Sequence, residues 1–219
     1  MIKIYKSILK NKILKKMSKN IDKIIYINLE KRVDRREEIE KELINYNLEF
    51  ERFNAIETQG FGILGCGLSH LSVFKLAKER NYKNVLILED DFTFTVSKED
   101  FETNLEKFFK LDLDYDVLFL SYYLNIESNN SEYEFLGKVI EAQTASGYLV
   151  NQKYYDKLIE LFEWAIPLLQ STGEHWNYAN DQVWKKLQKE DNWYYLIPRM
   201  GKQRNGYSDN SQIYINYDC

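Results

Sequence analysis

The stretch Val85-Leu-Ile-Leu88, followed directly by Glu89-Asp90-Asp91, decides the fold of this chain. Four consecutive apolar residues are typical of a strand that is buried on both faces of a parallel sheet. The earlier stretch Lys23-Ile-Ile-Tyr-Ile-Asn28 has the same apolar, β-branched character. Both stretches end in polar residues, and open α/β sheets bind their ligands at the carboxyl ends of the strands. We therefore expect the functional site at this edge of the sheet.

Helical and strand-like segments alternate on both sides of this stretch. Asp34 followed by Glu37 resembles a capping box and predicts the start of a helix, whereas Pro167 predicts the end of another. The expected helices are about 34–47, 68–80, 101–109, 152–166 and 180–189, and the further strands are 48–53, 116–122, 193–197 and, as a strand or hairpin, 139–150. Repeated units of this length predict an α/β fold with a mainly parallel sheet and helices on both faces.

The composition bounds the class of protein. The 219 residues are 44% hydrophobic and 29% charged, which excludes disordered and fibrous classes and predicts a sizeable core. We expect residues 21–219 to form one compact domain. The two cysteines, Cys66 and Cys219, provide no disulfide framework, and no CxxC pair suggests a zinc site. This usage fits a reducing compartment, so we expect a cytoplasmic protein.

Charge is distributed unevenly along the chain. Residues 1–20 contain seven lysines and no acidic residue, although the whole chain carries a net charge of −4. We expect this segment to be a basic arm or an extra helix, and a weak, peripheral contact with an anionic membrane surface is the alternative. The segment lacks the continuous apolar run of a membrane span or a secretory signal. The acidic remainder argues against a nucleic-acid partner, which would require a basic face.

Glu89, Asp90 and Asp91 place three like charges at the end of a buried strand. These charges repel one another unless a cation compensates them, and carboxylates at positions i and i+2 suit Mg²⁺ or Mn²⁺. A divalent metal that is shared with a substrate phosphate is therefore one interpretation. A solvated acidic turn is the other, and the residues alone leave both open.

Two further groups of polar residues accompany the expected elements. Arg32, Arg35 and Arg36 follow the first strand, and they fit either a diphosphate site or a charged first helical turn. Ser69 and His70 are adjacent on an expected helix, where neighbours project about 100° apart, so they cannot form a nucleophile and base pair. This excludes the simplest hydrolase interpretation. His70, near the expected start of the helix, is then either a structural histidine or a ligand-binding one.

Gly60-Phe-Gly62-Ile-Leu-Gly65 matches the dinucleotide-binding pattern G-x-G-x-x-G. That pattern must follow a strand directly, whereas residues 54–59 intervene here, and the first strand ends without any glycine. We therefore do not expect a nicotinamide or flavin cofactor.

Four short motifs occur in a distinctive order along the chain. They are Ile25 to Arg36 (IYINLEKRVDRR), Arg52 to Ile56 (RFNAI), Gly65 to His70 (GCGLSH) and Leu86 to Asp91 (LILEDD). Weaker matches follow at residues 144–148 and 180–184 and in Gln203 with Ser208-Asp209. The combination resembles the family 25 glycosyltransferases, which include the lipooligosaccharide galactosyltransferases of bacteria and the procollagen galactosyltransferases.

The resemblance implies a GT-A type nucleotide-sugar-binding fold, a UDP-sugar donor of galactose or glucose, a Mn²⁺ or Mg²⁺ cofactor and inversion at the anomeric carbon. Glu89, Asp90 and Asp91 would hold the metal in place of the DxD-like element of the family. The acceptor would be a hydroxyl group of a glycan, as in lipopolysaccharide biosynthesis, or of a hydroxylated protein.

The resemblance also implies roles for residues around the donor sugar. Asn28, Arg32 and Arg36 would contact the nucleotide. Ser69 and His70 would lie near the donor.

An inverting transfer requires a base that takes the proton of the acceptor hydroxyl, and a carboxylate is the usual solution. Asp181 is the first candidate for this base and Glu174 is the second. The alternative for Asp181 is a charge at a helix N-terminus that stabilises the helix dipole. His175 or Asp209 would add a third contact to the metal.

Two functions of other classes stay open. Glu89-Asp90-Asp91-Phe-Thr93 has the form of the D-x-D-x-T motif of haloacid-dehalogenase-type phosphatases, but Glu89 stands where the nucleophilic Asp belongs. A catalytically silent nucleotide-sugar-binding domain on the same scaffold is the other alternative. The acidic cluster argues against it, because a silent domain has no use for carboxylates that repel one another.

Overall fold

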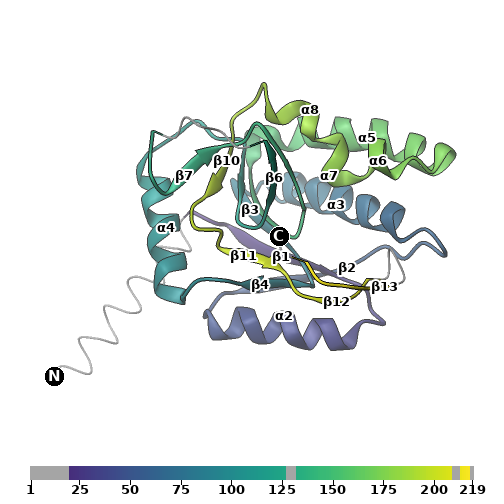
Figure 1. The fold of residues 1–219 in the computed structure, drawn as a ribbon, viewed down its shortest axis with the longest axis horizontal. Coiled ribbons are helices and arrows are strands. Elements are labelled where there is room, and N and C mark those ends of the chain that lie inside the picture. The colour runs from purple at the N-terminus through teal and green to yellow at the C-terminus, as the bar shows by residue number, and fades with distance from the viewer. Residues whose placement is uncertain (1–19, 127–131, 209–212, 218–219) are drawn as a thin grey trace.

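The computed structural model describes residues 20–126, 132–208 and 213–217, and it has a mixed α/β fold (Figure 1). Seven strands form the main sheet in the order β2-β1-β3-β9-β5-β10-β7. Strands β2, β1, β3, β5 and β10 run in one direction, and β9 and β7 run against them. The expected α/β class with a mainly parallel sheet is confirmed. The expected basic arm at residues 1–20 lies outside the described residues, apart from Asn20.

The strands are short, and three small sheets accompany the main one. The main sheet contains β1 (Lys23–Asn28), β2 (Phe50–Asn54), β3 (Asn84–Glu89), β5 (Val117–Phe119), β7 (Leu136–Lys138), β9 (Gly147–Asn151) and β10 (Trp193–Leu196). The two-stranded sheets pair β4 (Phe92–Phe94) with β11 (Gly201–Gln203), β6 (Tyr123–Ile126) with β8 (Glu141–Gln143), and β12 (Gly206–Ser208) with β13 (Ile213–Ile215).

Helices cover both faces of the main sheet (Figure 1). On one face α3 (Gly62–Glu79) packs against α5 (Tyr155–Thr172), and on the other lie α2 (Val33–Asn45) and α4 (Lys98–Lys110). The remaining helical elements are short: η1 (Gln152–Tyr154), α6 (His175–Tyr178), α7 (Asn180–Val183) and α8 (Lys185–Gln188).

The two faces of the sheet belong to two separate apolar cores. Ile25 and Ile87 point toward α3 and α5, whereas their neighbours Tyr26 and Leu88 point toward α2 and α4. Side chains alternate between the faces because the strand period is two residues. Complete burial of such a side chain contributes about 1.5–3 kcal/mol, so the inner strands are fixed from both sides.

The register of the sheet brings the polar ends of β1 and β3 to one edge. Ile27 of β1 lies opposite Glu89 of β3 in a parallel ladder. The antiparallel strand β9 begins at this same edge, where Glu89 N–H donates to the carbonyl of Ser146. The loop that precedes β9 therefore lies beside the carboxylates that follow β3.

Helix α3 begins six residues earlier than the expected start at residue 68, so the glycine-rich stretch from Gly62 onward is part of the helix. The glycines allow the start of α3 to pack closely against the segment that precedes it. A Cβ at Gly65 would lie 2.4 Å from the carbonyl oxygen of Ile56. His70 therefore lies within the helix and not near its start.

Helix α5 continues through Pro167 and ends at Thr172, which corrects the expected end at residue 166. Proline removes one helical hydrogen bond, but here Ile166 and Leu169 on either side of it are buried and hold the helix in place. The helix ends where Gly173 adopts a left-handed conformation with φ of 72°.

Three other expectations about the elements were also wrong in detail. Asp34 does not cap α2, because the cap position is Arg32 and no side chain bonds there. The segment 139–150 forms two strands in different sheets, since β8 pairs with β6 and β9 joins the main sheet. The segment 180–189 forms two short helices and not one.

Among the residues that the structure describes, we find no helix with the length and apolar character needed to cross a membrane.

Candidate active site

A pocket of about 460 Å³ opens at the carboxyl edge of β1 and β3, and we refer to it as the first pocket. Asn28 is the last residue of β1, Glu89 is the last residue of β3, and Asp90 and Asp91 follow β3. The segment 55–62 forms the facing wall, and Tyr207 closes one side. The three carboxylates are thus brought together at the edge where the sequence predicted a site.

Asp90 is buried and fully engaged by its neighbours. Its Oδ2 accepts a hydrogen bond of 2.8 Å from Asn28 Nδ2, and its Oδ1 accepts one of 3.0 Å from Arg35 Nη1. Asn28 is itself held by Arg52, whose Nε donates to Asn28 Oδ1 at 3.0 Å. Despite these partners, burial raises the pKa of Asp90. Asp90 therefore connects the edge of the sheet to α2, and both of its carboxylate oxygens already have hydrogen-bond partners.

Asp91 is less well compensated. Arg35 Nη1 lies 3.3 Å from its Oδ2, while its Oδ1 is a buried oxygen with no hydrogen-bond partner among the described residues. Burial and then the charge of Glu89 raise the pKa of Asp91 to about 7. A buried carboxylate oxygen without a hydrogen-bond partner raises the free energy of the folded protein. A ligand that binds Oδ1 would remove this penalty.

Glu89 contacts two side chains of α3. His70 Nε2 lies 3.0 Å from Glu89 Oε1, and Cys66 Sγ lies 3.5 Å from the same oxygen. Burial acts to raise the pKa of Glu89, but these contacts outweigh it and hold the pKa below its ordinary value. Glu89 therefore stays ionised. Burial, followed by the charge of Glu89, raises the pKa of the Cys66 thiol well above its ordinary value.

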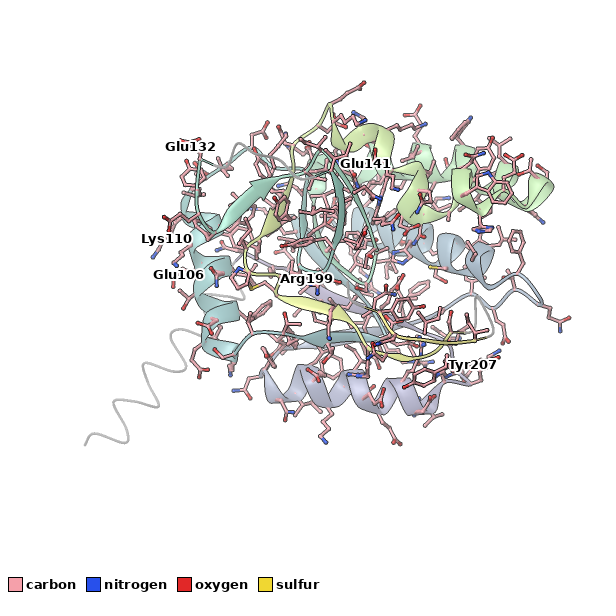
Figure 2. The ribbon with its side chains drawn as sticks, viewed as in Figure 1. Glu106, Lys110, Glu132, Glu141, Arg199 and Tyr207 are labelled. Atoms are coloured by element: carbon pink, nitrogen blue, oxygen red, sulfur yellow. The ribbon has the colours of Figure 1, made fainter. Side chains whose placement is uncertain are left out.

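Arg35 is the important residue that the sequence did not single out from its neighbours. It bridges Asp90 and Asp91, and its Nη2 donates to the carbonyl of Tyr207 at 2.8 Å. Figure 2 shows Tyr207 beside α2, so Arg35 links that helix to the C-terminal strands. Burial works against the charge of Arg35, but Asp91 and Asp90 raise its pKa. One signal was present, because Arg35 was one of three arginines that follow the first strand.

Arg32 and Arg36 do not line the first pocket. Arg32 forms two hydrogen bonds with Asp34, of 2.9 and 2.8 Å. Of the three arginines that follow the first strand, Arg35 is the one that lines the first pocket. The physical reason is the helical period of about 100° per residue, which turns adjacent side chains of α2 in different directions.

Ser69 and His70 both line the first pocket but do not bond to each other. Ser69 Oγ donates to Gly65 O at 2.7 Å and accepts from Ile56 N at 2.9 Å, so it joins α3 to the wall of the pocket. His70 Nδ1 lies 2.6 Å from the Tyr148 hydroxyl. His70 is thus fixed on one side by Tyr148 and on the other by Glu89.

A second pocket of about 480 Å³ adjoins the first. Five residues line both pockets: Cys66, Glu89, Gln203, Ser208 and Tyr217. Asp181 lies in the wall of the second pocket only, where its Oδ2 accepts from Thr144 N–H at 3.3 Å and its Oδ1 from Gln182 at 3.3 Å. Burial raises the pKa of Asp181. Glu89 therefore has one pocket on each side.

Glu174 lines neither pocket. It precedes α6, and its Oε2 accepts a hydrogen bond of 2.9 Å from Asn177. His175 and Trp176, the next two residues, do line the second pocket. Asp209, the other candidate for a third metal contact, lies outside the described residues.

Two sets of side chains could hold a cation. Cys66, His70 and Glu89 offer ligand atoms within 4.8 Å of one another, but the raised pKa of Cys66 keeps its thiol protonated. A hard cation prefers oxygen ligands, and the unpartnered Oδ1 of Asp91 together with the ionised Glu89 fits that chemistry. We therefore consider Glu89 and Asp91 to fit a divalent metal better than Asp90 or the Cys66 set.

Acidic side chains beside a pocket at the carboxyl edge of a mainly parallel sheet place this chain in the class of α/β proteins that bind ligands at that edge. The comparison with protein families is more specific. The chain matches the model described as glycosyltransferase family 25 (LPS biosynthesis protein) over residues 58–172, and it belongs to this family. The expected family is therefore confirmed.

Curated relatives match shorter parts of the chain. R655, a glycosyltransferase-like protein of Acanthamoeba polyphaga mimivirus, is 34% identical over 40% of this chain and 33% of its own length. Procollagen galactosyltransferase 1-B of Xenopus laevis is 28% identical over 50% of this chain and 22% of its own length. The chain thus spans a third or less of the length of these relatives.

Solved structures of glycosyltransferases are distantly similar. The galactosyltransferase LgtC, solved with donor and acceptor sugar analogs, is 11% identical with a TM-score of 0.47, covering 87% of this chain and 91% of that chain. GlyE of Streptococcus pneumoniae TIGR4 is 14% identical with a TM-score of 0.46, covering 80% of this chain and 44% of that one.

Proposed function

We propose that this chain is a metal-dependent, inverting glycosyltransferase that moves a hexose from a UDP-sugar to a hydroxyl group of an acceptor. The observation that carries the proposal is the unpartnered, buried Oδ1 of Asp91 beside the ionised Glu89, at the boundary of two pockets. A protein that only binds sugars has no need for this uncompensated charge. Residues 21–219 would form the single domain that carries the activity.

The first pocket suits the donor. Helix α3 begins at its wall, and no side chain caps the first N–H groups of that helix. Free N–H groups at a helix start bind phosphate well, and Arg35 adds a cation at the opposite side. Asn28 would act indirectly, because its side chain is already bonded to Asp90, Arg32 O and Arg52.

Glu89 and Asp91 would hold the divalent cation, and a bound cation supplies neutralisation of the charge that develops on the diphosphate. His70 would keep Glu89 in place through the contact of 3.0 Å. Arg35 would keep Asp91 in place and bring positive charge to the same side of the pocket.

The second pocket suits the acceptor, and Asp181 is the proposed base. In the transfer, the acceptor oxygen forms a bond to the anomeric carbon while the bond from that carbon to the phosphate oxygen breaks. UDP departs with the bonding electron pair, and the hydroxyl proton passes to Asp181. Burial raises the pKa of Asp181, which makes its carboxylate a stronger proton acceptor.

A ligand screen tests the proposal. UDP, UDP-galactose, UDP-glucose and GDP-mannose are each added with Mn²⁺ and with EDTA, and the melting temperature of the protein is measured. We expect stabilisation by UDP-sugars that requires Mn²⁺, followed by slow release of UDP from the donor that is bound. Cooperative melting without a shift from any nucleotide would contradict the proposal. Hydrolysis of p-nitrophenyl phosphate would instead support a phosphatase.

A further inference from the structure

The second pocket has an exposed tryptophan at its rim. Trp176 of α6 lines this pocket with 60% of its surface exposed, whereas Trp184 and Trp193 are completely buried. Trp164 is also exposed but lines neither pocket, so the informative feature of Trp176 is that its exposed ring lies in a pocket, where it offers apolar area to a ligand. Trp176 is therefore a candidate contact for whatever enters the second pocket.

Short-range contacts fix the segment that carries Trp176. The left-handed Gly173 ends α5, and Glu174 accepts a hydrogen bond of 2.9 Å from Asn177 across the first turn of α6. The ring of His175 packs edge-on against the ring of Trp176, with 5.1 Å between the centroids. A side chain that is already held in place loses little conformational entropy when it binds a ligand.

The inner wall of the same pocket is polar. The half-buried carboxylate of Asp181 lies there with Thr144 and Gln182. Asn180 lies deeper and donates to Cys66 Sγ at 3.4 Å. One pocket thus offers an aromatic ring at the rim and hydrogen-bonding groups inside.

We propose that the second pocket binds a carbohydrate acceptor, with the apolar C–H face of a sugar ring against Trp176 and a hydroxyl group toward Asp181. A pyranose has both features, one apolar face and hydroxyl groups around its edge. The volume of about 480 Å³ is that of a site for a small ligand, and not of a groove for an extended peptide. This inference rests on the proposed function and names the substrate class of its acceptor side.

The test uses acceptor-dependent release of UDP from UDP-galactose with Mn²⁺. Methyl β-D-galactopyranoside and lactose serve as acceptor probes, and a hydroxylysine-containing collagen peptide represents a protein acceptor. We expect a saccharide to accelerate release and to form a labelled product. In Trp176→Ala the KM for that saccharide should rise at least about 10-fold, while the stabilisation by UDP-galactose with Mn²⁺ stays the same. Trp176→Phe should restore most of the affinity.

Trp164→Ala is the matched control, because Trp164 is 50% exposed on α5 and lines neither pocket. This variant should keep the wild-type KM. An unchanged saccharide KM in Trp176→Ala would overturn the inference. Acceleration by the collagen peptide and by neither saccharide would also overturn it. Failure of the wild-type protein to bind any UDP-sugar would instead contradict the proposed function, so the two failures are distinguishable.

Discussion

The two pockets meet at Glu89 but are built from different kinds of structure. The first pocket lies at the ends of β1 and β3, two strands that are buried on both faces, and Arg35 compensates part of its negative charge. The second pocket shares the end of β3 and residues of α3 and of the C-terminal strands, but most of its other residues come from α6, α7 and the loop before β9, and these two helices are four residues long. The first pocket is thus held by the core of the protein, and the second by short local contacts.

This difference suggests a division of tasks. A donor with a fixed nucleotide and diphosphate needs charges at constant positions, which a buried sheet edge supplies. An acceptor site needs only a base and a surface that recognises the acceptor. Single substitutions test this division of tasks.

Asp91→Asn should reduce transfer about 1,000-fold or more, because it removes one of the two proposed oxygen ligands and the charge that attracts the cation. Mn²⁺-dependent stabilisation by UDP-galactose should disappear. Without metal the variant should be no less stable than the wild-type protein at pH 8, since one of three repelling carboxylates is gone. Thermal melting and UDP release measure both effects.

Asp156→Asn is the control for this change, because Asp156 is 75% exposed and pairs only with Lys78 in the described structure. It should bind donor as the wild-type protein does. Metal-dependent donor binding retained in Asp91→Asn would contradict the metal assignment.

Asp181→Asn should lower kcat by about 100- to 1,000-fold, because an amide cannot take the proton of the acceptor hydroxyl. The affinity for UDP-galactose should stay nearly unchanged, since Asp181 lies in the second pocket only. Steady-state kinetics and thermal shifts separate the two quantities. Asp156→Asn, which changes an exposed carboxylate outside both pockets, is again the control and should retain full activity. A loss of donor affinity in Asp181→Asn would place this residue in the donor site.

Arg35→Ala should lower the free energy of unfolding by about 2–4 kcal/mol, because it leaves Asp90 and Asp91 buried without their cation. Arg36→Ala should change it by less than about 0.5 kcal/mol. Urea denaturation measures both values. Addition of Asp90→Asn to Arg35→Ala should recover part of the loss, and equal effects of the two arginine variants would refute the special role of Arg35.

Asp34→Asn should have the smallest effect, below about 1 kcal/mol, because Asp34 is 64% exposed and its pairing with Arg32 is screened by water. The hydrogen bond with Arg32 lowers the pKa of Asp34 to about 2, below its unfolded value. The stabilisation is therefore complete above about pH 4 and is lost as the pH falls toward 2. Urea denaturation of both proteins at pH 7 and pH 3 should show a difference that shrinks at pH 3. A difference in the free energy of unfolding that grows at pH 3 would contradict this prediction.

The sequence predicted the parts of the molecule that depend on local patterns. The apolar runs of β1 and β3 identified the inner strands, and the acidic residues after β3 lie at the predicted edge. The start of α3 was missed because glycine usually marks a loop, whereas here Gly65 allows close approach to Ile56. Pro167 predicted the end of a helix that in fact continues, because the packing of α5 outweighs the tendency of proline to end helices.

The contacts within the site could not be predicted in the same way. Arg35 reaches Asp90 across 55 residues of sequence, and its choice over Arg32 and Arg36 depends on the exact turn of α2. Trp176 lies in a four-residue helix, which has no periodic pattern to read. Asp181 was named from a family resemblance, and only the fold shows that it lines a pocket next to Glu89.

The two pockets share only five residues, and this separation has a consequence for evolution and engineering. The segment from Gly173 to Gln182 carries most of the remaining wall of the second pocket, and it connects two helices at the surface. If the second pocket binds the acceptor as proposed, exchange of residues 173–179, which keeps Asn180 and the proposed base Asp181, would alter acceptor choice and leave the residues of the first pocket unchanged.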